Sequence, residues 1–122
     1  MSVSIQILGV KKTKAFLRKK KLNTNIQANI GLTKAAIFMQ GEVKSSIAGR
    51  RSEPTSVDTG RFLNSIGFTA GKLDAIVFSL VNYARFLEFG TSRFVGRRHF
   101  NNSLDRNRLN IRNILNKQIK NI

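Results

Sequence analysis

The chain has 122 residues, of which 22 are lysine or arginine and only six are acidic, so its formal net charge is +16. This length predicts a single domain, residues 1–122. The absence of cysteine excludes disulfides, thiolate zinc sites and cysteine nucleophiles. No apolar run approaches the about 20 residues of a spanning helix. The N-terminus also lacks the charge order of an export signal, so we expect a soluble protein with no membrane partner.

The first half of the chain predicts one strand and two helices. Val3, Ile5 and Ile7 alternate with polar residues, which is the period of a strand. Residues 11–22 form an amphipathic segment that we expect to be a short helix. A long helix follows from Thr24 and ends by Gly49. Its predicted core-facing stripe consists of Ile26, Ile30, Thr33, Ala36, Ile37, Val43 and Ile47.

A polar loop and a hairpin are predicted next. Residues 50–57 contain the only proline and are predicted to be a mobile loop. Strands at 65–70 and 75–81, joined by a turn at 71–74, predict an antiparallel hairpin. We expect the first strand of the chain to join this hairpin, because a lone strand would leave its backbone groups unpaired.

The last third predicts two helices. Tyr83 to Gly90 reads as a short helix that ends at the glycine, and a basic loop follows it. The C-terminal segment predicts one helix with an apolar stripe of Phe100, Leu104, Ile111, Leu115, Ile119 and Ile122. The fold class is therefore α+β, with a small, mostly antiparallel sheet flanked by the long N-terminal-half helix and the C-terminal helix.

The residues that could carry chemistry are few and scattered. His99 is the only histidine, and without partners it makes neither a metal cluster nor a catalytic triad. We expect it to be a structural residue in a loop or at a helix start. General acid–base catalysis needs two groups held close together, whereas the acids are dispersed, and no phosphate-binding glycine motif is present. We therefore expect no enzyme activity, no metal site and no cofactor.

The excess of positive charge predicts a polyanionic or acidic partner. Two basic segments are the predicted contacts: Lys11, Lys12, Lys14, Arg18, Lys19, Lys20 and Lys21 in the first, and Arg93, Arg97 and Arg98 in the second. Binding of DNA through such segments would weaken steeply with salt and show little sequence preference. The first segment surrounds most of a helix's circumference, which fits a solvated helix equally well.

Two short motifs carry a resemblance to a known family. DTGRFLNSI, residues 58–66, is followed after the predicted hairpin by YARFLEFGT, residues 83–91. The pair resembles a family of tailed-bacteriophage proteins named after gene product ten of a lambdoid coliphage, whose members are tail components, neck or tail-completion proteins. The matching residues are Asp58, Thr59, Gly60, Arg61, Ser65, Ile66, Tyr83, Ala84, Glu88, Gly90 and Thr91. After the second motif the family has a proline-rich turn, whereas this chain has RFVGRRHF without proline.

The resemblance implies a virion structural protein of the head–tail junction, assembled in the host cytoplasm. Copies of it would form a ring, hexameric or dodecameric, that joins the DNA-filled head to the tail around the DNA channel. Its neighbours would be other neck, connector or tail proteins, and double-stranded DNA in the channel would be a non-specific contact. The alternative is a small basic protein that binds nucleic acid without sequence specificity.

The matched residues are expected to act as scaffold. We expect Glu88 to form an ion pair with a nearby arginine, Arg61, and so to hold the two motif segments together. Tyr83 and Ala84 are expected to pack the short helix onto the sheet, and Gly90 to set the turn that ends it.

Overall fold

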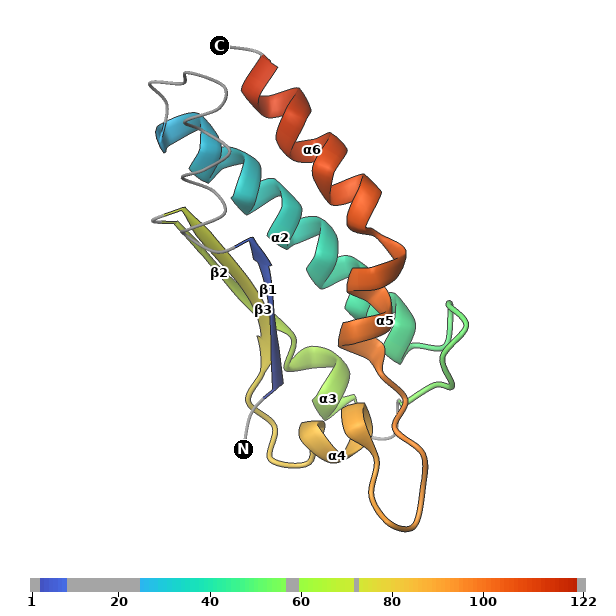
Figure 1. Ribbon diagram of the computed structural model, residues 1–122. Coiled ribbons are helices and arrows are strands. Elements are labelled where there is room, and N and C mark those ends of the chain that lie inside the picture. The colour runs from blue at the N-terminus through green and yellow to red at the C-terminus, as the bar shows by residue number, and fades with distance from the viewer. Residues whose placement is uncertain (1–2, 9–24, 57–59, 72, 121–122) are drawn as a thin grey trace.

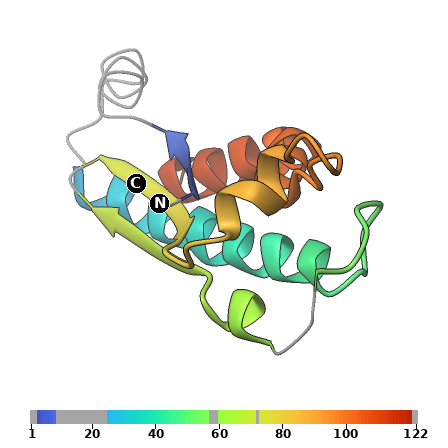
Figure 2. The same ribbon diagram turned by 90° about the horizontal axis from the view of Figure 1, so that it is seen from below.

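The computed structural model describes residues 3–8, 25–56, 60–71 and 73–120. Its fold is α+β, as the sequence predicts: a three-stranded antiparallel sheet and the C-terminal helices pack against one long helix, α2 (Asn25–Ile47) (Figure 1). Two short helices, α3 (Arg61–Asn64) and α4 (Ala84–Phe89), lie at one end of the molecule, the lower end in Figure 1 and the end nearer the viewer in Figure 2.

The sheet has the strand order β1-β3-β2, with β1 spanning Val3–Leu8, β2 spanning Gly67–Gly71 and β3 spanning Asp74–Ser79. The predicted hairpin is confirmed with shorter strands, and β1 joins it beside β3. The predicted alternation of the first strand is also confirmed in the part whose side chains are described, since Val3 and Ile5 are buried and Ser4 is exposed. Alternate residues of β3 face the core in the same way.

Helix α2 runs unbroken between its predicted ends. Gly49 follows it with a φ of 84° and donates its N–H to the carbonyl of Ser46 at 3.1 Å, a left-handed ending that glycine adopts without strain. Gly31 lies inside the helix against α6, where an added Cβ would lie 3.2 Å from Leu115 Cδ2. The missing side chain therefore lets the two helices approach closely.

The predicted core-facing stripe of α2 was wrong in its first half. Ile26, Ile30 and Ile37 are 74%, 39% and 53% exposed. Helix α2 packs against the sheet on one side and against the C-terminal helices on another, so its buried arc is wide and includes small residues. The buried side chains of α2 are Ala28, Leu32, Ala35, Ala36, Met39, Val43, Ser46 and Ile47.

The single predicted C-terminal helix is two helices, α5 (His99–Arg106) and α6 (Arg108–Lys120). The break falls at Asn107, which has a φ of −113° and whose side-chain amide donates to the Ser103 carbonyl at 2.9 Å and to Glu42 Oε1 at 3.0 Å. Asparagine commonly competes with helical hydrogen bonding in this way. Of the predicted stripe, Phe100, Ile111 and Leu115 are buried and Leu104 is half-buried, while Ile119 and Ile122 fall outside the described side chains.

The remaining predictions concern loops and short elements. Helix α4 is confirmed, and α3 was not predicted. The described part of the 50–57 loop is fastened to the end of α2, because the Ser56 N–H and the Thr55 hydroxyl both donate to the Ile47 carbonyl, at 2.8 and 3.1 Å. Its mobility stays a prediction. The helix predicted at 11–22 lies outside the described residues.

Candidate functional site

The two motif segments meet where α3 packs beside the start of α4. Phe62 is buried, and its ring meets that of Tyr83 edge-on with the centroids 6.1 Å apart. The Arg61 guanidinium lies 5.7 Å from the centre of the same tyrosine ring, within the range of a cation–π contact. The structure therefore brings the two motifs together through the Tyr83 ring.

The other described residues of the first motif are structural. Gly60 precedes α3 with a φ of 83°, which favours glycine. The Ser65 hydroxyl bonds the carbonyl of Phe62 at 2.6 Å and the hydroxyl of Ser79 at 2.7 Å, which ties α3 to β3. Ile66 enters the core. Asp58 and Thr59 lie outside the described residues.

Glu88, in the second motif, is a buried carboxylate that binds the first turn of α5. Its side chain is nearly inaccessible, with a residue exposure of 1%. Oε1 accepts from the Phe100 N–H at 2.9 Å, and Oε2 accepts from the Asn101 N–H at 2.9 Å and its side-chain amide at 2.7 Å. The N–H groups of a helix's first turn lack partners within the helix and favour a negative charge.

The predicted ion pair between Glu88 and Arg61 was therefore wrong. None of the ion pairs among the described residues includes Glu88. Its carboxylate joins α4 to α5, whereas Arg61 lies against Tyr83. Ala84 is fully buried and Tyr83 is half-buried against the core, so both residues pack inward as predicted, with the Tyr83 ring against Phe62 of α3.

Two glycines allow the chain after α4 to fold back close against the backbone at the end of the helix. Gly90 has a φ of 83°, and a Cβ on it would collide with the backbone nitrogen of Gly96. A Cβ on Gly96 would in turn lie 2.5 Å from the Glu88 carbonyl oxygen. Between the glycines, the Thr91 N–H donates to the Phe94 carbonyl at 3.0 Å. The loop is consequently closed at its base by backbone contacts that only glycine permits.

His99 begins α5 and is fully buried between two serines. Its Nδ1 lies 2.7 Å from Ser46 Oγ and its Nε2 lies 2.7 Å from Ser56 Oγ. Because the Ser46 hydroxyl donates to Glu53 Oε1 at 2.5 Å, the imidazole donates from Nδ1 to Ser46 and accepts at Nε2 from Ser56. Burial lowers the pKa of His99 to about 4; the Glu53 carboxylate opposes this shift and Arg97 adds to it. The ring is therefore neutral at pH 7.

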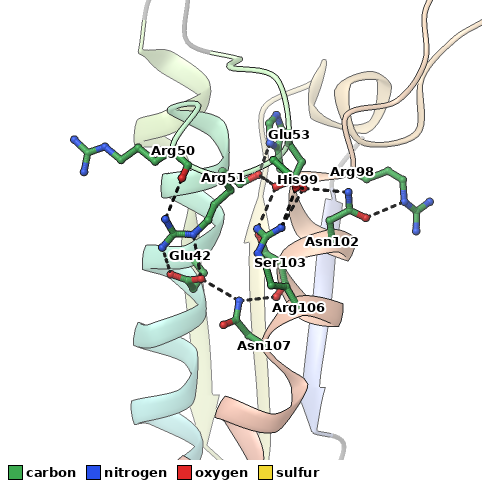
Figure 3. A network of polar contacts seen from close by, with 12 residues as sticks. Glu42, Arg50, Arg51, Glu53, Arg98, His99, Asn102, Ser103, Arg106 and Asn107 are labelled. Carbon is green, nitrogen blue, oxygen red and sulfur yellow. Dashed lines mark hydrogen bonds and ion pairs between the residues drawn. The ribbon is translucent and has the colours of Figure 1, made fainter.

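Glu53 is the second buried carboxylate, and it fixes the 50–56 loop to α5. Arg106 donates to both of its oxygens at 3.1 Å, a two-pronged pair (Figure 3). Burial by itself raises the pKa of Glu53, but hydrogen bonds from Arg106, Ser46, Ser52 and Asn102 outweigh it and lower the pKa to about 2. Glu53 is therefore ionised at pH 7 with each oxygen occupied.

Nothing in the sequence indicates that Glu53, His99 and Arg106 lie together, because 45 residues separate Glu53 from His99 and none of the three residues belongs to either motif. Next to them, the Glu42 carboxylate of α2 pairs with Arg51 of the 50–56 loop at 2.7 Å and accepts a hydrogen bond from the Asn107 amide at the end of α5 (Figure 3). Glu42 therefore adds a second connection between α2, the loop and α5. The spacing of these residues in the sequence contained no signal that would have located the cluster.

Serine, histidine and glutamate are also the residue types of a hydrolytic triad, but their connection here is different. A second hydroxyl, Ser46, stands between the carboxylate and the imidazole, and Arg106 shares the carboxylate. A histidine with a pKa of about 4 is a weak general base at pH 7. Within the described residues no group of three or more acids and histidines could hold a metal ion. The cluster is best understood as a clamp between α2, the 50–56 loop and α5.

The predicted basic contacts divide into three cases. Arg93 and Arg98 are exposed on the loop between α4 and α5. Arg97 is half-buried, and its Nη1 donates to the Thr55 carbonyl at 2.5 Å and to Ser56 Oγ at 2.9 Å, so it holds the 50–56 loop. Outside the described residues lie Lys11, Lys12, Lys14, Arg18, Lys19, Lys20 and Lys21.

Comparisons of this chain with protein-family models, with curated proteins and with solved structures find no match. None of the described helices combines the length and the apolarity that crossing a membrane would take.

Proposed function

We propose that this chain is a virion structural protein of a tailed phage, a neck or tail-completion component that joins the DNA-filled head to the tail. In this proposal, copies of the chain form a ring, hexameric or dodecameric, around the DNA channel and contact other neck, connector or tail proteins. The chain acts as a structural part of the particle and not as an enzyme.

The observation that carries the proposal is the junction of the two motifs. Matching residues from segments separated by the hairpin meet at the Tyr83 ring, and the second motif reaches α5 through the Glu88 carboxylate. These motif residues hold α3, α4 and α5 in one arrangement, which is the scaffold role that the resemblance implies. Ile26, Ile30 and Ile37, exposed along α2, give further support, because exposed apolar side chains at helical spacing favour association.

Removal of the gene from a phage that carries it tests the proposal. We expect DNA-filled heads and separate tails to accumulate, and the chain supplied in trans to restore joined particles. Purified particles from the complemented infection should contain the chain in a fixed ratio to the tail-tube protein. Normal joined particles without the chain, or a chain found only in the soluble fraction, would contradict the proposal.

A small basic protein that binds nucleic acid without sequence specificity is the second candidate, and the net charge of +16 favours it. The two functions differ in where the chain ends up after infection. The nucleic-acid-binding function predicts tight, salt-sensitive binding of the isolated chain to any DNA duplex, and no requirement for it in joining heads to tails.

A further inference from the structure

Helix α4 and the loop that follows it expose four apolar side chains, which we call the α4 tip: Phe86, Phe89, Phe94 and Val95. They are 41%, 59%, 41% and 88% exposed. Phe86 and Phe89 are one helical turn apart and share a side of α4, and a bridge between Gly90 and Val95 brings the loop back beside the helix end. Figure 1 shows this segment projecting at the end of the molecule opposite the C-terminus.

The α4 tip is held in this exposed position by the backbone. The loop is closed by the close approach of the Gly90 and Gly96 backbones and by the Thr91–Phe94 hydrogen bond. The Arg97 N–H also donates to the Leu87 carbonyl at 2.7 Å. Single exposed apolar side chains are common on protein surfaces. Four of them on one fastened segment indicate a binding surface, because a fixed loop loses little freedom when a partner binds.

The exposed charges on the segment that carries the α4 tip are all positive. Arg85, Arg93 and Arg98 are exposed on the same segment. The Arg98 Nε donates to Asn102 Oδ1 at 3.4 Å, and Figure 3 shows the end of its guanidinium directed outward from the Glu53 cluster. The only acid between residues 85 and 98 is Glu88, which is buried against α5. An apolar centre with a positive rim is complementary to a surface that carries apolar side chains edged by carboxylates.

A second copy of this chain does not offer such a surface within the part that the structure describes. Glu42, Glu53 and Asp105 each hold an arginine, at 2.7, 3.1 and 2.9 Å. Glu88 is buried, and Asp74 also has a partner. Two copies that met tip to tip would instead bring their like-charged arginines together.

Duplex DNA fits the arginines but not the apolar centre. Phosphates would satisfy the positive rim, whereas contacts to the DNA backbone are polar and ionic and leave four apolar side chains without a matching surface. The tip therefore favours a protein.

We propose that the α4 tip docks against an amphipathic acidic segment of another protein, whose apolar side chains cover the four tip residues and whose carboxylates reach the flanking arginines. This inference deepens the proposed function and rests on it for the place where the partner is met. Its test uses the isolated full-length chain, so the two can fail separately.

The test compares two fluorescent peptides of equal negative charge by anisotropy at physiological ionic strength. One peptide is an amphipathic helix with leucines on one face and glutamates on the other, and in its control the leucines are replaced by glutamines. We expect the native chain to bind the leucine peptide about tenfold more tightly than its control. The double variant Phe89→Ser/Val95→Ser should bind both peptides equally, at the level of the glutamine peptide, because its arginines remain.

Leu80→Ser/Leu109→Ser is the matched control variant, since it removes two apolar side chains outside the α4 tip that are 72% and 65% exposed. It should keep the full preference for the leucine peptide, and thermal unfolding should show that both variants fold like the native chain. Equal binding of the two peptides by the native chain would overturn the proposal. A preference that survives in the tip variant, or one that is lost in the control variant, would also overturn it. Other ligands are tested with the same variants. If the native chain shows no peptide preference and the tip variant loses binding to duplex DNA, the tip binds nucleic acid and the proposal is wrong. If the tip variant instead loses binding to phosphatidylserine vesicles, the tip binds a membrane surface and the proposal is equally wrong.

Discussion

Two neighbouring residues, Glu88 and Phe89, reverse the usual distribution of polar and apolar side chains. Glu88 is buried and satisfied by three donors from α5, whereas Phe89 next to it is more than half exposed. The same contrast separates the whole clamp of Glu53, His99 and Arg106 from the α4 tip. Buried polar groups need particular partners, so the interior of this end of the fold fixes one geometry. The apolar side chains of the α4 tip are exposed on the outside of the same end, where the proposed partner would bind.

The largest expected effect is at Glu88. Glu88→Ala leaves two backbone N–H groups of α5, at buried Phe100 and half-buried Asn101, without an acceptor. We expect the free energy of unfolding to fall by about 4 kcal/mol. Glu88→Gln keeps one acceptor oxygen and should lose about half as much. Denaturant unfolding at pH 7 measures both. A loss below about 1 kcal/mol in the alanine variant would show that α5 does not depend on this carboxylate.

The close approach of Gly90 and Gly96 at the base of the loop is the next test. Gly90→Ala places a Cβ against the Gly96 backbone at a φ of 83°, and we expect a loss of about 3 kcal/mol in the free energy of unfolding. Gly41→Ala is the control, because nothing lies within 4 Å of the added Cβ on this helical residue. It should stabilise the chain by about 0.5 to 1 kcal/mol. Equal effects of the two substitutions would contradict this close approach.

Acid should weaken the clamp in two stages. The pKa of His99 is about 4 in the folded chain and about 6.5 when unfolded, so the unfolded chain binds the proton first as the pH falls. Stability should therefore decrease between about pH 6.5 and 4, by at most about 3 to 4 kcal/mol. Glu53, with a folded pKa of about 2, extends the loss from about pH 4.3 downward. The measurement is the free energy of unfolding of the native chain and of His99→Gln at a series of pH values. The variant should show no loss of stability between about pH 6.5 and 4. If the variant loses as much stability as the native chain in this range, another group causes the effect.

The smallest expected effect is on the exposed side of the comparison. Phe89→Ser removes an apolar side chain that the fold does not bury, so the free energy of unfolding should change by less than about 0.5 kcal/mol. Chemical denaturation in parallel with the Glu88 variants makes the contrast direct. A loss of several kcal/mol would mean that Phe89 belongs to the core and that the α4 tip is not a free surface.

The elements of this fold were predictable where one local pattern dominates. Three local patterns each indicated one structure: the alternation of Val3 and Ile5, the turn signal at Gly71 and the glycine after α4. The structure confirms the strand, the hairpin and the helix end that they predicted. The face of α2 was not predictable in the same way. Isoleucines at helical spacing suggest a core face, but a helix packed on two sides buries alanine and leaves Ile26 and Ile37 outside.

The candidate site was predicted in part. The two motif segments lie together, as expected, but through the Tyr83 ring against Phe62 and Arg61 and not through the predicted ion pair of Glu88 with Arg61. The partner of Glu88 was missed because it is the backbone of α5, and backbone N–H groups have no residue signature. The cluster around His99 was missed because its members come together only through the tertiary fold, and the pairing of Glu53 with Arg106 has no counterpart in sequence spacing.

Imaging of the assembled particle at its neck, at a resolution that traces side chains, tests the central claim most directly. We expect density for this chain in a closed ring around the DNA channel, with α3, α4 and α5 arranged about Tyr83 and Glu88 as described. We also expect Phe89 and Val95 to lie against an acidic segment of a neighbouring protein. A neck that is complete without this chain would contradict the proposed function.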